Sequence, residues 1–251
     1  MRGLSPSELL DVWERGESQR SHERALTILS AALPDRPEGL LEALSVGRRD
    51  GLLLTVRELT FGPTLEALTE CPRCGERLEL ELETGAVRVE PRPQPRPAAG
   101  AGELQVGDWS VRFRAPSAAD LAAAAGADGP EQARAVLLAR CVASAAEAGQ
   151  VRAVAELPGE VVQALAARMA ELDPQADVRL ALSCPACGVG WEEVFDVAAF
   201  FWHEISACAP RLLREVHALA AAYGWREADI LAMGPRRRQA YLEMVGRWAT
   251  S

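Results

Sequence analysis

Cys71-Pro72-Arg73-Cys74-Gly75 and Cys184-Pro185-Ala186-Cys187-Gly188 are two near-identical stretches that stand more than a hundred residues apart, and they decide the fold. Each places two thiols two residues apart in a tight turn. The glycine after the second cysteine permits the positive φ with which backbone N–H groups point at sulfur. Together they supply four thiolates, the number that a tetrahedral structural zinc site needs. We therefore predict a structural Zn²⁺ held by Cys71, Cys74, Cys184 and Cys187.

Other uses of these cysteines stay open. A Cys-x-x-Cys pair also fits a redox centre or a disulfide. Two copies with matched proline and glycine favour zinc, because a thioredoxin-type centre usually needs one motif at the start of a helix. A site with four sulfur ligands has no open position for catalysis, so the motif indicates a binding or assembly protein. Cys141 and Cys208 lie among apolar helical neighbours and are predicted to be core residues.

We call each of the two Cys-x-x-Cys-Gly stretches a knuckle. The residues around both knuckles are predicted to form β-strands. Leu78, Leu80 and Leu82 alternate with glutamates after the first knuckle, which is typical of a strand with one buried face. Leu180 and Leu182 alternate in the same way before the second. The predicted fold class is α+β: mostly helical, with a small antiparallel zinc-ribbon-like β element that joins the N- and C-terminal halves.

Periodicity and breakers divide the remainder of the chain into helices and linkers. Ser5 as an N-cap, with Pro6 at the first helical position, predicts the first helix, and 109–113 alternates like a short strand. Further helices are expected over 25–32, roughly 38–44, 52–61, 131–146, 159–172, 197–223 and 228–233, and from 235 onward. The expected segments are a helical region over 1–62, the first zinc hairpin over 63–89, a proline-rich linker over 90–102, a strand plus helical region over 103–175, the second zinc hairpin over 176–196 and a C-terminal helical module over 197–251.

Composition and charge exclude some classes of function. The 251 residues carry a formal net charge of −9, which argues against a protein whose main function is to bind nucleic acid. Affinity for nucleic acid comes mainly from neutralising its phosphates with basic side chains. The first residues lack the apolar stretch of a signal peptide, and no segment is apolar enough to span a bilayer. Paired free thiols suit a reducing compartment, so a bacterial cytoplasmic location is expected.

No motif supports an enzyme. His203-Glu204 begins like the zinc-protease helix motif, but Ala207 stands where the second histidine should fall. Nucleophile elbows, phosphate-binding loops and dinucleotide fingerprints are absent from the sequence. One compact basic cluster, 236–238, leaves a zinc-ribbon adaptor for nucleic acid as the alternative function.

Several stretches carry a resemblance to a known family. They are Leu9-Leu10-Asp11-Val12-Trp13, Arg57-Glu58-Leu59-Thr60-Phe61-Gly62-Pro63, the second knuckle with 180–183 before it, Phe200-Phe201-Trp202-His203-Glu204-Ile205, and the block from Arg211 to Leu242. With these stretches the chain resembles bacterial phage-baseplate-type proteins of contractile tail and contractile injection system clusters. That group is related to the hub assembly proteins of T-even phages.

The resemblance implies a non-catalytic protein that helps to build the baseplate hub, as a chaperone or a structural adaptor. Its implied partners are hub, spike or tube proteins of a contractile particle. The lack of an apolar span predicts no membrane partner, and the acidic net charge argues against nucleic acid. The C-terminal helices are the expected contact surface. The candidate partner-binding residues are Trp202, Trp225, Ile230, Leu231, Arg237 and Tyr241.

Overall fold

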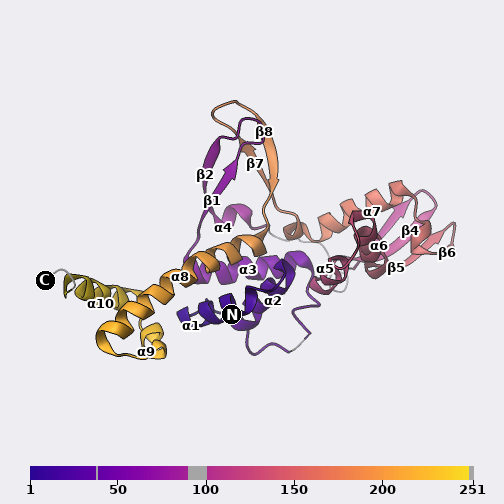
Figure 1. Cartoon of the computed structure of the whole chain (residues 1–251). Helices are drawn as coiled ribbons and strands as arrows, with labels where there is room; N and C mark the ends of the chain where they lie inside the picture. Colours follow the sequence, from indigo (N-terminus) through magenta and orange to yellow (C-terminus); the bar gives the residue numbers. More distant parts are fainter. Residues whose placement is uncertain (38, 90–100, 249–251) are drawn as a thin grey trace. The chain divides into compact units, whose positions relative to one another are not determined.

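A computed structural model of the chain describes residues 1–37, 39–89 and 101–248, and its fold is α+β, as predicted (Figure 1). Of the expected proline-rich linker over 90–102, residues 90–100 lie outside the described residues. The helices are α1 (Pro6–Gly16), α2 (Ser21–Ala32), α3 (Val46–Phe61), α4 (Thr84–Val87), α5 (Ala118–Ala124), α6 (Pro130–Cys141), α7 (Gly159–Leu172), α8 (Val197–Tyr223), α9 (Glu227–Ala232) and α10 (Pro235–Trp248), with 3₁₀ turns at Val154–Glu156 and Pro174–Ala176. The strands are β1 (Thr64–Glu70), β2 (Arg77–Glu83), β3 (Ala101–Val106), β4 (Trp109–Arg114), β5 (Val142–Glu147), β6 (Gln150–Arg152), β7 (Arg179–Ser183) and β8 (Gly190–Val194).

The chain divides into two compact units, each assembled from separate stretches of sequence. Unit 1 comprises Met1–Pro34, Val56–Gly62 and Ala198–Ser251, and unit 2 comprises Asp35–Thr55 and Pro63–Val197. Both zinc hairpins expected from the sequence belong to unit 2.

Unit 1 is helical. Ser5 is the N-cap of α1, as predicted, and it forms a capping box with Glu8, in which the Ser5 hydroxyl accepts from the Glu8 N–H and the Glu8 carboxylate accepts from the Ser5 N–H. The long helix α8 has the predicted bounds, and its seam is buried at Phe201, Ile205, Leu212 and Leu219, among others. Burial of this seam against the other helices of the unit is the main stabilising contribution expected for such a helix.

A buried ion pair fastens α8 to the end of α3. The Arg57 guanidinium donates two hydrogen bonds to the Glu204 carboxylate and a third, of 2.6 Å, to the Gly62 carbonyl. The Arg57 side chain is only 4% exposed. Because guanidinium and carboxylate planes match in this two-bond geometry, the pair fixes orientation as well as contact.

Unit 2 contains a four-stranded antiparallel sheet in the order β3-β4-β5-β6. One face carries Trp109, Val111 and Phe113, which alternate along β4 and pack with Val161 and Leu165 of α7. This alternation was the strand signal expected over 109–113, and it is confirmed in β4.

Two secondary-structure expectations are wrong. The helix expected over 131–146 ends at Cys141, and 142–147 forms strand β5, in which Val142 and Ala145 pair with β4. Sheet pairing here overrides the helical propensity of an alanine-rich sequence. Residues 39–44 form turns in place of the third expected helix, and Glu38 lies outside the described residues.

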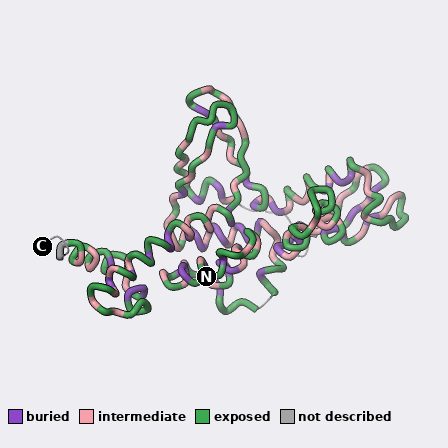
Figure 2. Tube along the Cα trace, viewed as in Figure 1, coloured by how far each residue is buried: buried purple, intermediate pink, exposed green. Residues whose placement is uncertain are grey.

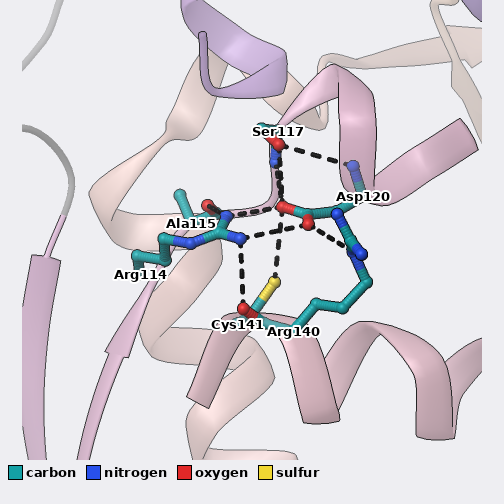
Figure 3. Close-up of polar contacts among 6 residues, drawn as sticks. All are labelled: Arg114, Ala115, Ser117, Asp120, Arg140 and Cys141. Atoms are coloured by element: carbon teal, nitrogen blue, oxygen red, sulfur yellow. Dashed lines mark hydrogen bonds and ion pairs between the residues drawn. The ribbon is translucent and has the colours of Figure 1, made fainter. Parts of the chain in front are cut away.

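A fully buried carboxylate, Asp120 of α5, joins three elements of unit 2 (Figure 3). It accepts hydrogen bonds from the Arg114 guanidinium at the end of β4 and from Arg140 Nε at 2.7 Å near the end of α6. Ser117 donates to the same carboxylate through both its N–H and its hydroxyl, at 2.8 Å each. These donors hold the pKa of Asp120 well below its usual range despite burial.

Candidate metal centre

Each Cys-x-x-Cys knuckle folds into the same local structure. In the first, Gly75 N–H donates to the Cys71 carbonyl at 2.9 Å, and Cys71 N–H donates to the Glu76 carbonyl at 2.9 Å. In the second, Gly188 N–H donates to the Cys184 carbonyl, and Cys184 N–H donates to the Val189 carbonyl, again at 2.9 Å. The two glycines have φ of 73° and 70°. The two knuckles thus form the same type of turn, and in each the glycine adopts the left-handed backbone conformation that the turn requires.

Two antiparallel hairpins carry the knuckles at their tips (Figure 1). β1 pairs with β2 and β7 pairs with β8, and each pair is a separate two-stranded sheet. Figure 2 shows buried positions at the cysteine-bearing tips and at the bases of the hairpins, with half-buried and exposed residues between. The face of β2 that was predicted to be buried is half-buried in the structure; its residues are Leu78, Leu80 and Leu82.

Polar contacts hold the two hairpins beside one another. Near the bases, Gln175 accepts from the Val89 N–H at 2.7 Å and donates to the Val87 carbonyl at 3.1 Å. Closer to the tips, the Thr69 hydroxyl donates to the Glu193 carboxylate at 2.7 Å. These contacts bring together two stretches of sequence that are far apart along the chain.

The four cysteine sulfurs converge at the tips. Cys71 Sγ lies 3.6 Å from Cys187 Sγ, and Cys74 Sγ lies 3.6 Å from Cys184 Sγ. All four ligand atoms lie within 4.8 Å of one another. A disulfide needs sulfurs about 2.05 Å apart, and in this structure all four are free thiols.

This arrangement fits a tetrahedral metal ion. Zinc–sulfur bonds of about 2.3 Å in a tetrahedron separate neighbouring sulfurs by about 3.8 Å, close to the cross-hairpin distances found here. Four soft sulfur donors in a closed set are typical of structural zinc or iron–sulfur sites. The ligand set would hold a metal between the hairpins, and it leaves that metal no free coordination position.

The thiols have unequal acidities in the protein alone. Burial opposes the Cys71 thiolate, but the N–H groups of Cys74 and Arg73 donate to its sulfur and lower its pKa to about 6. At Cys74, a hydrogen bond from the Glu76 N–H favours the thiolate, but burial and the neighbouring thiols raise the pKa to about 12. Four negative charges this close repel one another, so a divalent cation is needed for all four sulfurs to ionise together.

The candidate partner-binding residues are spread over unit 1. Trp202 of α8 is half-buried and packs over Gly16, with the Arg24 guanidinium 4.4 Å from the centre of its ring. Trp225 and Tyr241 are also half-buried. Their ring centres are 4.8 Å apart in an edge-to-face arrangement, and Tyr223 stacks on Trp225 at 4.5 Å.

The other three candidates differ in exposure. Arg237 is exposed at the start of α10. Ile230 and Leu231 of α9 are 0% and 5% exposed, so in this structure their side chains belong to the core. Of the arginine cluster, Arg238 is buried, where it donates to the Glu215 carboxylate at 2.9 Å and to the Met233 carbonyl at 2.7 Å.

Sequence reasoning did not find the residues that position the metal ligands. The Gln175 contacts with 87–89 and the bond from Thr69 to Glu193 each join segments about a hundred residues apart. Neither polar residue belongs to a periodic pattern or a motif. The similarity of the two knuckles was the one signal in the sequence that the hairpins lie together. It indicated only that their tips meet, and not which residues hold the hairpins beside one another.

Among the helices that the structure describes, none combines the length and the apolar character that a bilayer crossing requires.

Comparison with known proteins gives one match. A family model described as T4 bacteriophage base plate protein matches residues 8–202, which is more than half of the chain. The matched range includes all four cysteines and ends at Trp202, so α9, α10 and most of α8 lie beyond it. No curated protein and no solved structure matches the chain.

Proposed function

The chain belongs to the T4 bacteriophage base plate protein family, and from that premise we propose that it is a non-catalytic protein that helps to assemble the baseplate hub of a contractile phage tail or tail-like particle. The single observation that carries this proposal is the family match over residues 8–202. In this role the protein acts in the bacterial cytoplasm, as an assembly chaperone or as a structural adaptor. Its partners are hub, spike or tube proteins.

The proposed role of the metal is structural. The four sulfurs at the hairpin tips are the ligands, Zn²⁺ is the proposed ion, and the two hairpins form a zinc-ribbon-like element. A closed site of this kind favours a scaffold, because a catalytic zinc keeps one position for water or substrate. The metal fixes the first hairpin to the second across more than a hundred residues of sequence.

The proposed partner surface lies on the C-terminal helices and α8. Half-buried tryptophan and tyrosine rings are frequent at protein interfaces, since one part of the ring packs in the protein and another stays open to a partner. Trp202, Trp225 and Tyr241 have this character, and the exposed Arg237 lies on α10. Ile230 and Leu231 hold α9 in place.

Deletion of the gene tests the assembly role. In a strain that produces the contractile particle, electron microscopy of the deletion mutant should show incomplete baseplates or tails without sheaths. Complementation with the wild-type gene should restore whole particles. Complementation with a variant in which all four ligand cysteines are serine should fail, whereas Cys208→Ala, outside the ligand set, should succeed. Normal baseplates in the deletion mutant refute the proposal.

A nucleic-acid adaptor is less well supported. Its motivation was the cluster at 236–238, but Arg238 is buried and neutralised by Glu215, so two arginines of the cluster remain exposed. Two exposed cations on a chain with a net charge of −9 give little of the phosphate neutralisation that drives such binding.

A further inference from the structure

A groove of about 630 Å³ in unit 1 is lined by residues of α8 and α10. Its lining includes Arg211, Leu212 and Glu215 from α8, and Arg236, Arg238 and Glu243 from α10. The family match ends at residue 202, so these residues lie beyond the matched range.

Two cations of the groove are open to a ligand. Arg211 and Arg236 are exposed, and within the described residues the Arg236 side chain makes no hydrogen bond or ion pair. Arg211 donates to Cys208 Sγ at 3.6 Å, and a thiol is a weak acceptor. Both guanidinium groups therefore keep most of their donors for a ligand.

Two of the other charges in the groove are paired with one another. Arg238 and Glu215 neutralise each other at 2.9 Å, with Arg238 only 6% exposed at its side chain. Glu243 is exposed and accepts a hydrogen bond of 3.4 Å from the neutral Gln239, so it keeps its negative charge. Leu212 is buried, and the exposed apolar part of the lining is formed by Pro235 and Ala240. The open charges of the groove are thus two cations, Arg211 and Arg236, and one carboxylate, with an apolar surface beside them.

We propose that this groove docks a short segment of a partner protein in which a carboxylate side chain lies next to an apolar one. The carboxylate pairs with Arg211 and Arg236, and the apolar side chain packs on Pro235 and Ala240. Guanidinium groups favour carboxylates because two parallel N–H donors match the two oxygens. The inference rests on the proposed function, since it gives the chemistry of the partner that the C-terminal helices contact.

A protein segment fits better than a nucleic acid. A nucleic acid presents a continuous line of phosphates, and Glu215 and Glu243 lie in the same groove as the arginines. A polypeptide can place one carboxylate at the arginines and uncharged residues along the remainder.

The test uses the full, metal-loaded chain and peptides of random sequence displayed on phage. Peptides that bind are synthesised with a fluorescent label, and their affinities are measured by anisotropy. We expect the selected peptides to share an Asp or Glu next to an apolar residue. The double variant Arg211→Glu/Arg236→Glu should lose at least tenfold in affinity. The matched control Arg214→Glu, on α8 but outside the groove, should stay within twofold of the wild type.

Selected peptides without carboxylates, or equal binding by the double variant, overturn the proposal. Binding of single-stranded DNA that the double variant abolishes overturns it in favour of nucleic acid. Circular dichroism checks the fold of each variant, and Arg211→Gln/Arg236→Gln serves if the charge reversals unfold the protein. These measurements use purified protein, so they can fail while the deletion strain still lacks baseplates, and the two proposals are tested separately.

Discussion

Asp120 carries one negative charge at a position with no solvent exposure, and side chains from three elements converge on it. A carboxylate in such a place is destabilising unless donors surround it, and here Arg114, Arg140 and Ser117 supply them. The side chains of the two arginines are about two-fifths exposed. Each is therefore partly in contact with solvent, while its guanidinium group donates to the buried carboxylate. The residue therefore ties the end of β4 and the end of α6 to the start of α5.

Replacement of Asp120 by asparagine should therefore destabilise the protein. Asparagine keeps the size but removes the charge, so two guanidinium groups lose their partner and a buried amide takes the place of acceptor oxygens. We expect the free energy of unfolding to fall by about 2–3 kcal/mol, measured by urea denaturation. Asp128→Asn, at an exposed position of the same region, is the control and should change it by less than about 0.5 kcal/mol. Equal effects of the two substitutions contradict the role given to Asp120.

The same carboxylate predicts a pH dependence. The pKa of Asp120 is lower in the folded chain than in the unfolded chain, where it is about 4. A group with a depressed folded pKa stabilises fully above its unfolded pKa, and its contribution is lost as the pH falls towards the folded pKa. The difference in unfolding free energy between wild type and Asp120→Asn should be constant between pH 5 and pH 7 and should shrink below about pH 4. Urea denaturation across this range measures it, and a constant difference down to pH 2 contradicts the prediction.

At the scale of elements, the two hairpins show one local structure built twice from a short sequence. Each knuckle has the same pair of backbone hydrogen bonds and a glycine with φ near 70°. A Cβ at Gly75 or Gly188 meets no atom within 4 Å, so space is available and the backbone conformation alone requires glycine. L-residues reach this region at a cost of about 1–2 kcal/mol.

Alanine at either glycine should weaken the metal site to a similar degree. We expect Gly75→Ala and Gly188→Ala each to reduce zinc affinity roughly fivefold to thirtyfold, because about 1–2 kcal/mol of strain opposes the bound geometry. Competition with a chromophoric chelator measures the affinity. Gly51→Ala is the control, since Gly51 lies inside α3 with open space around it, and there alanine should leave zinc affinity unchanged. A large effect at only one knuckle contradicts their equivalence.

Elements with a strong local pattern could be predicted from the sequence, and those that depend on distant partners could not. Leu78, Leu80 and Leu82 specified β2 by alternation, and the N-cap Ser5 with the following proline specified the start of α1. β5 was missed because Ala145 and its neighbours have helical propensity, and only pairing with Val111 of β4 makes them a strand. Pattern reasoning finds what a segment prefers alone, whereas sheet pairing depends on the segment beside it.

The candidate site divides in the same way. The grouping of the four cysteines could be predicted because spacing and a following glycine are local properties of the chain. The contacts that position them, such as Gln175 with the Val89 N–H, join residues 86 positions apart and leave no local trace. The groove was missed for the same reason. Arg236 belongs to a basic cluster that is evident in the sequence. Arg211 lies within a long helix, and nothing in its local sequence indicates that it lines a groove together with residues of α10.

At the scale of the whole molecule, a metal held by the four cysteines would close a long loop. Cys74 and Cys184 are 110 residues apart, and a metal between them would restrict the unfolded chain across that whole interval. By analogy with a disulfide, closing a loop of this length stabilises the folded state by about 4–5 kcal/mol. The sheet of β3 to β6 and helix α7 all lie within the closed interval.

Removal of the metal should therefore lower the stability of the molecule well beyond the hairpins. Elemental analysis of protein purified without chelator should find one zinc per chain. A strong chelator should then lower Tm by roughly 10–20 °C, followed by differential scanning calorimetry. Cys208→Ala should retain the zinc, and replacement of Cys184 by serine should lose it. Purified protein without any bound metal, or a Tm that the chelator leaves unchanged, contradicts the structural role.

The order of the ligands along the chain also sets a timetable for synthesis. The ribosome makes the first two cysteines 110 residues before the matching residues of the second pair. At about 5–20 residues per second, the early thiols wait for about 5–20 s before their counterparts exist. During that interval the β3–β6 segment is already emerging and can fold first. The site can therefore bind an ion only after Cys187 has been made, while α8, α9 and α10 are still to be synthesised.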